Sequence, residues 1–112
     1  MARIIVIYQI DLREGVEVQE FIRFFNDEYA PMAARINWRG SIGMADRGER
    51  KGKLAFFWEF DNQAQRDIAC PAENSPTETA KALMGTAWEE SGKTWDRLVE
   101  KATYSGDYVI QA

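Results

Sequence analysis

Apolar residues occupy both faces of two predicted strands in this chain. Residues 3–11 and 53–60 are rich in β-branched and aromatic side chains, which favour an extended backbone. The first segment places Ile4, Val6, Tyr8 and Ile10 on one face, with Ile5 and Ile7 on the other. The second places Leu54, Phe56 and Trp58 on one face, with Ala55 and Phe57 on the other. We therefore expect two strands that are covered on both sides.

Two weaker strands complete the predicted set. Residues 37–46 alternate Trp38, Gly40 and Ile42 with polar or small residues, and the glycines weaken this strand because they offer no side chain to pack. The polar residues 47–52 form a turn, so this strand and the one at 53–60 are predicted to pair as a hairpin. Residues 104–111 form the closing strand.

Helical periodicity fills the two intervals between these strands. Over residues 16–36 apolar side chains recur every three or four positions, and Pro31 predicts a kink or restart near residues 29–32. Asp61 is predicted to cap a short helix at residues 62–69. Residues 75–78, with the sequence Ser-Pro-Thr-Glu, form a capping-box pattern with Ser75 as the cap. An apolar stripe then predicts helix to about Ala102, with Gly85 and Gly92 as weak points.

The predicted order is strand, helix, strand, strand, helix, strand, which is the ferredoxin-like βαββαβ arrangement of the α+β class. We expect residues 1–112 to form a single domain, in which a four-stranded antiparallel sheet carries both helices on one face. The other face would then expose apolar side chains whichever way the strands turn. A second copy packed sheet against sheet would cover this face, so we expect a homodimer.

Composition excludes several classes of function. The formal net charge is -4 over 112 residues, and no basic face is apparent, so nucleic acid is not an expected partner. No apolar run approaches the length of a membrane span, and the single cysteine, Cys70, fits a reducing compartment, so a cytoplasmic protein is expected. The chain contains no histidine, which excludes histidine-ligated haem, a histidine base and a histidine-containing metal site. No cofactor is expected.

The block order resembles that of the dimeric α+β barrel superfamily over the whole chain. Residues 26–32, with the sequence Asn-Asp-Glu-Tyr-Ala-Pro-Met, look like the first helix of its EthD-like branch, where a His-Ala-Pro-hydrophobic pattern is usual. Tyr29 stands in the histidine position, and tyrosine titrates near pH 10 rather than near neutrality. The resemblance, which extends to the antibiotic-biosynthesis monooxygenase type, implies a pocket between the sheet and its helices.

Aromatic residues are the candidate lining of such a pocket, although core packing explains each of them as well. The candidates for ligand binding are Tyr8, Tyr29, Trp38, Arg39, Trp58, Met84 and Trp88. Three carboxylates near strand ends, Asp11, Glu59 and Asp107, are further candidates, but solvation or capping explains them equally.

Two classes of function follow from this set. One is a cofactor-independent oxygenase, or a related enzyme, acting on a flat apolar or phenolic compound. The other is a non-enzymatic ligand-binding or assembly module.

Overall fold

The computed structural model describes residues 2–72 and 76–111. Within these ranges the chain forms one antiparallel sheet with the strand order β2-β3-β1-β4. The strands are β1 (Ile4–Leu12), β2 (Arg39–Met44), β3 (Leu54–Phe60) and β4 (Val99–Val109). The two strands with apolar side chains on both faces, β1 and β3, lie in the centre of the sheet.

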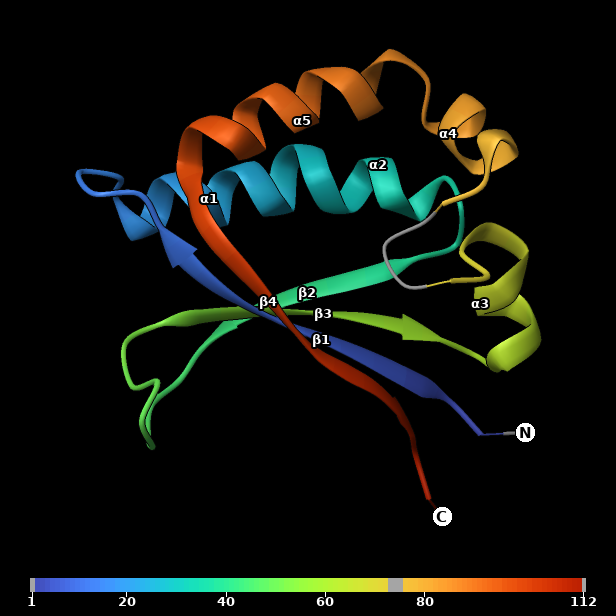
Figure 1. Cartoon of the computed structure of the whole chain (residues 1–112), viewed down its shortest axis with the longest axis horizontal. Helices are drawn as coiled ribbons and strands as arrows, with labels where there is room; N and C mark the ends of the chain where they lie inside the picture. The colour runs from blue at the N-terminus through green and yellow to red at the C-terminus, as the bar shows by residue number, and fades with distance from the viewer. Residues whose placement is uncertain (1, 73–75, 112) are drawn as a thin grey trace.

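The helices cover one face of this sheet, which confirms the ferredoxin-like α+β fold. The first helical region consists of α1 (Val18–Phe24), the π-helix η1 (Phe25–Tyr29) and α2 (Ala30–Ala34). The second consists of α3 (Gln63–Ala69), α4 (Glu78–Met84) and α5 (Thr86–Leu98). In Figure 1 the α1-to-α2 row and α5 lie side by side above the sheet, and α3 and α4 lie at one end. The lower face of the sheet in this view carries no helix.

Strand register places the largest side chains against the helices. Ile4 pairs with Phe60, Val6 with Trp58, Tyr8 with Phe56 and Ile10 with Leu54 across β1 and β3. Except for Tyr8, all of these side chains are buried. The helices therefore cover the face that carries Ile4 and Phe60, a choice that the apolar residues on both faces of these strands had left open.

The irregularity predicted near Pro31 is present, but it lies one turn earlier, as the π-helix η1. The Ala30 N–H donates to the Phe25 carbonyl, a five-residue spacing that defines the π turn. Pro31 follows directly and occupies the first turn of α2. Its missing N–H is harmless there, because the first amides of a helix lack partners within that helix. The π turn thus absorbs the proline without breaking the row.

The second helical region differs from its prediction at three points. Asn62, rather than Asp61, caps α3 through a side-chain oxygen that accepts from the Gln65 N–H. Thr77 caps α4 by accepting from the Ala80 N–H at 3.1 Å. The predicted cap, Ser75, lies outside the described residues.

The third difference is the length of the helix. Gly85, at φ 64°, separates α4 from α5, and helix ends at Leu98. Val99 and Ala102 therefore belong to β4, which starts five residues earlier than predicted. The spacing of apolar residues did not reveal this change, because Val99 and Ala102 continue the helical spacing although they belong to a strand.

Gly40 in β2 provides a test of this packing. A Cβ atom at Gly40 would lie 2.5 Å from Trp58 Cζ3 and 3.1 Å from Phe25 Cζ, whereas one at Gly43 would lie 3.6 Å from Phe57 Cε2. We expect Gly40→Ala to lower the free energy of unfolding by ~1–3 kcal/mol, as overpacking does. Urea denaturation should show this loss, with Gly43→Ala in the same strand as the matched control. Equal stabilities of the two variants would contradict the packing described.

Candidate functional site

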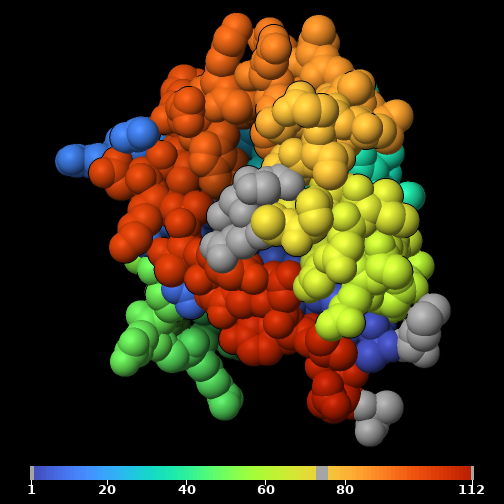
Figure 2. Space-filling model, turned by 45° about the vertical axis from the view of Figure 1, so that its right-hand side comes forward, coloured from blue at the N-terminus to red at the C-terminus, as the bar shows by residue number. Residues whose placement is uncertain are grey.

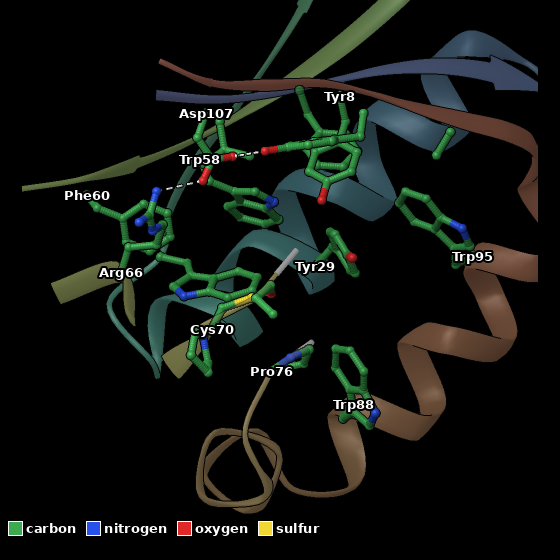
Figure 3. A pocket seen from close by; sticks show the side chains of 17 residues that line it. Tyr8, Tyr29, Trp58, Phe60, Arg66, Cys70, Pro76, Trp88, Trp95 and Asp107 are labelled. Atoms are coloured by element: carbon green, nitrogen blue, oxygen red, sulfur yellow. Dashed lines mark hydrogen bonds and ion pairs between the residues drawn. The ribbon is translucent and has the colours of Figure 1, made fainter. Parts of the chain in front are cut away.

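A cavity of about 560 Å³ lies between the inward face of the sheet and the helices. Its wall is mostly aromatic, and the residues come from β1, β3, β4, η1, α3 and α5 and from the segments that flank α3 and β2. The aromatic residues on this wall are Tyr8, Tyr29, Trp38, Phe56, Trp58, Phe60, Trp88, Trp95 and Tyr104. The volume is within the ~300–1,000 Å³ usual for ligand sites. Figure 3 shows these side chains converging from the sheet and from α5 on Tyr29.

Tyr29 lies at the centre of this wall. Its ring centroid is 5.2 Å from that of Trp95, 5.7 Å from that of Trp58 and 6.2 Å from that of Phe56. Phe24 and Phe25 of the same helical row contact its other side at 5.6 Å and 5.9 Å. The π turn ends at Tyr29, and such turns change which side chains face the sheet.

Burial among these rings also fixes the protonation state of Tyr29. Loss of solvation raises the pKa of its hydroxyl to about 12, because a phenolate is poorly stabilised among apolar rings. At neutral pH the group is therefore an uncharged phenol. Among the described residues this hydroxyl has no hydrogen-bond partner. It is thus available to donate to a molecule in the cavity.

One side of the cavity is polar. Arg66 of α3 donates from Nη1 to Asp107 Oδ2 of β4 at 2.9 Å, and Tyr104 donates its hydroxyl to Asp107 Oδ1. Arg66 also pairs through Nε with Asp67 Oδ1 at 2.9 Å. Figure 2 shows the two elements in contact on the surface, with α3 in yellow-green beside β4 in red. The charges of Arg66 and Asp107 balance on the wall, and Asp67, which is outside the wall, also pairs with Arg66, so this side presents no free cation.

A bulge in β4 creates this polar side. The register with β1 shifts between Ile7 and Tyr8, whose partners are Gly106 and Tyr104, so Ser105 is left without a partner position. In a regular strand, residues three apart point to opposite faces. The extra residue places Tyr104 and Asp107 on the same, inward face. Gly106, at φ 132°, adopts a positive-φ backbone conformation in this bulge that residues with a side chain rarely take.

Five of the seven residues predicted for ligand binding line the cavity, and two do not. Tyr8, Tyr29, Trp38, Trp58 and Trp88 form part of the wall. Arg39 instead pairs with Asp61 at 2.9 Å at the end of β2, because its neighbour Gly40 takes the inward position. Met84 is buried at 1% exposure in a separate cluster with Met32 and Ile36. Binding by these residues stays a prediction.

The three candidate carboxylates have different surroundings. Asp107 is on the cavity wall, whereas Asp11 pairs with Arg50 at 3.0 Å and Glu59 lies 3.5 Å from both Arg3 and Arg39. Sequence reasoning did not identify Arg66 or Tyr104. The one signal for the latter was Gly106, since an isolated glycine within a strand pattern suggests a bulge. Arg66 gave no signal, because a short polar helix does not indicate which side faces the sheet.

Three further features concern metals, membranes and the single cysteine. Within the described ranges no group of three or more His, Cys, Asp or Glu side chains is arranged to hold a metal ion. None of the helices in those ranges has the length and apolar character needed to cross a membrane. Cys70 lies on the cavity wall and its thiol donates to the Ala72 carbonyl at 2.9 Å.

A second cavity of about 470 Å³ shares part of this wall. Tyr29, Trp88 and Trp95 line both cavities, and the remaining lining of the second comes from α5. These α5 residues are Glu89, Ser91, Gly92, Lys93 and Asp96. The shared rings therefore lie between the first cavity and a second opening along α5.

The raised pKa of Tyr29 predicts a loss of stability at high pH. Between pH 10 and about 12 the unfolded chain loses the phenolic proton while the folded chain keeps it. The unfolded state then binds fewer protons, so the free energy of unfolding falls as pH rises through this window. Chemical denaturation at about pH 9 and about pH 11.5 should show a smaller fall for Tyr29→Phe than for the parent chain. Tyr108→Phe, at an exposed tyrosine, is the control; if it reduces the fall as much, Tyr29 is not responsible.

Comparison with known proteins identifies the fold. No family model and no curated protein matches the chain. A NIPSNAP domain protein from Burkholderia xenovorans is 16% identical, with a TM-score of 0.68 over 97% of this chain and 95% of that chain. A DABB family protein with a ferredoxin-like fold from Mesorhizobium loti is 19% identical, with a TM-score of 0.60 over 100% of both chains. A dimeric protein of unknown function and ferredoxin-like fold from Bacteroides fragilis is 18% identical, with a TM-score of 0.53 over 96% of both. Identities this low show a shared ferredoxin-like fold and nothing finer.

Proposed function

We propose that this chain is a homodimeric small-molecule-binding protein of the dimeric α+β barrel type. Its ligand is a flat, largely apolar and uncharged compound that occupies the cavity between sheet and helices. The observation that carries this proposal is the aromatic wall around the unpartnered Tyr29 hydroxyl. Aromatic rings bind flat apolar molecules through area and stacking, and a single donor orients them.

The charge of the polar side supports an uncharged ligand. Arg66 is the one cationic side chain on the wall among the described residues, and Asp67 and Asp107 both pair with it. A carboxylate or phosphate ligand would have to compete with both carboxylates for Arg66. A neutral molecule with a carbonyl can instead accept from Tyr29, and one with a hydroxyl can donate to Asp107.

A cofactor-independent oxygenase is the second candidate, and Tyr29 is the observation that favours it. In such a reaction an acidic C–H bond of the substrate loses its proton to water, and the resulting carbanion transfers electrons to dioxygen as the new C–O bond forms. A protonated Tyr29 close to the bound carbonyl would stabilise the enolate oxygen formed in this step. The residues 26–32 that resemble the EthD-like branch contain this tyrosine. That likeness stays a prediction.

Anthrone distinguishes the two candidates, because it is flat, uncharged and carries both a carbonyl and an acidic methylene group. Without dioxygen, we expect anthrone to quench the tryptophan fluorescence of the protein, with a Kd that Tyr29→Phe weakens roughly tenfold through loss of one buried hydrogen bond. With dioxygen, an oxygenase would convert anthrone and O₂ into anthraquinone and water, which absorbance and an oxygen electrode measure together.

The matched control is Tyr108→Phe, which removes an exposed hydroxyl remote from the cavity wall. Binding without turnover would support the binding protein alone. Turnover above the rate in buffer that falls in Tyr29→Phe, but not in Tyr108→Phe, would support the oxygenase. If anthrone fails to bind, or binds equally to the parent chain and to Tyr29→Phe, the role proposed for Tyr29 is wrong.

We also propose that the homodimer forms through the helix-free face of the sheet. Ile7 and Phe57 are paired at the centre of this face, and both remain partly exposed in the single chain. Arg3, Arg39 and Glu59 form a polar group at one end of the same face. An apolar centre with a charged edge is typical of protein interfaces. The Bacteroides fragilis protein of similar fold is itself described as dimeric.

Phe57→Glu is expected to convert this dimer into a monomer, because it places a charge in the apolar centre of the interface. Light scattering at micromolar concentration should give twice the 12.9 kDa of one chain for the parent protein and 12.9 kDa for the variant. Ile68→Glu, at a residue 78% exposed on α3, is the control and should remain dimeric. A monomeric parent protein would contradict the proposed interface.

The proposal also includes the domain organisation of the chain and its location in the cell. Residues 1–112 form a single ferredoxin-like domain in this proposal, and one cysteine, which cannot form a disulfide within the chain, is consistent with a cytoplasmic protein.

A further inference from the structure

The second cavity has a wall of three aromatic rings around an open space. Tyr29 and Trp95 contact each other, with ring centroids 5.2 Å apart. Trp88, seven residues before Trp95 on α5, lines the same cavity without a ring contact to either. Figure 3 shows Trp88 and Trp95 on the same side of α5, both directed toward Tyr29. Three aromatic side chains therefore border one opening.

Gly92 keeps this opening clear. It lies one turn after Trp88 and one turn before Trp95, so it belongs to the same face of α5. A Cβ atom at Gly92 would meet no atom within 4 Å. A glycine inside a helix also lowers its stability relative to alanine, and no close packing requires one here. Because Gly92 has no side chain, the space between Trp88 and Trp95 stays open.

The rim of the second cavity is acidic. Glu89 and Asp96 line it, and among the described residues neither carboxylate has an ion-pair partner. Lys93 also lines it, but its ammonium lies 3.7 Å from Glu90 on the same helix. The rim thus combines two unpaired negative charges with one positive charge that a neighbouring carboxylate already attracts.

We propose that the second cavity binds an organic cation, of the alkylammonium class. The faces of tryptophan and tyrosine rings carry negative potential and attract cations, most strongly quaternary ammonium groups that are weakly hydrated. Glu89 and Asp96 add long-range attraction at the rim. The first cavity is proposed to bind an uncharged ligand and the second a cation. The two ligands would lie on either side of the shared wall of Tyr29, Trp88 and Trp95. This site does not depend on the function proposed for the first cavity.

Choline and its uncharged carbon analogue, 3,3-dimethylbutan-1-ol, test this proposal, because they share shape and differ in charge. We expect choline to bind the parent protein roughly twofold to thirtyfold more tightly than the analogue, which is the range for a cation on aromatic faces. Two-dimensional NMR of the indole N–H groups measures both affinities. Choline should shift the signals of Trp88 and Trp95 more than those of Trp38 and Trp58.

Three variants locate the site. Gly92→Leu fills the opening and should weaken choline binding more than tenfold, while the helix is retained because leucine is the better helix former. The double variant Glu89→Gln with Asp96→Asn should weaken choline binding and leave that of the analogue unchanged. Lys93→Gln should strengthen choline binding, since it removes the positive charge on the rim.

Glu78→Gln is the control for net charge, because Glu78 is an exposed carboxylate on α4 outside the cavity. It should leave the affinity for choline unchanged. Equal affinity for choline and the analogue, no binding of choline, or an unchanged affinity in Gly92→Leu would each overturn the cation site. Circular dichroism of every variant confirms that a lost affinity does not reflect a lost fold.

Discussion

The packing of the Tyr29 ring between the sheet and α5 is the contact on which the cavities and the helix layer both depend. Phe24 and Phe25 hold this ring from its own helical row, and Phe56, Trp58 and Trp95 hold it from β3 and α5. Aromatic rings pack at fixed separations and tilts, so five such contacts leave the ring little freedom. The ring joins the two helical regions to the sheet and borders both cavities.

Local constraints in the sequence explain how Tyr29 reaches this place. Pro31 cannot donate the hydrogen bond that a continuous α-helix would require, and the π turn that precedes it ends at Tyr29. Gly40 lets β2 approach Trp58 and Phe25 more closely than any other residue would. Both residues act through steric limits on the backbone rather than through their own contacts with the cavity. A ligand site is therefore specified partly by residues that do not line it.

The sequence predicted the fold well because the dominant signals were local. Alternation along β1 and β3 showed which residues share a face but not which face turns inward, and the order of elements specified the sheet topology. The cavity was predicted less completely, since its polar side depends on where β4 begins and on its bulge. Tyr104 and Asp107 share a face only because Ser105 adds a residue, and Arg66 meets Asp107 across 41 positions of the chain. Such a contact has no periodicity from which to infer it.

The absence of histidine now has a structural meaning beyond the reactions it excludes. A histidine at position 29 would lie among five aromatic rings, where burial lowers the pKa of imidazole and disfavours its charged form. Tyrosine in the same place remains an uncharged donor over the whole physiological range, because its pKa rises with burial to about 12. The position therefore offers a hydrogen bond that does not change with pH. A site of this kind recognises a neutral acceptor by geometry, while the charges at Arg66 and along α5 are confined to its edges.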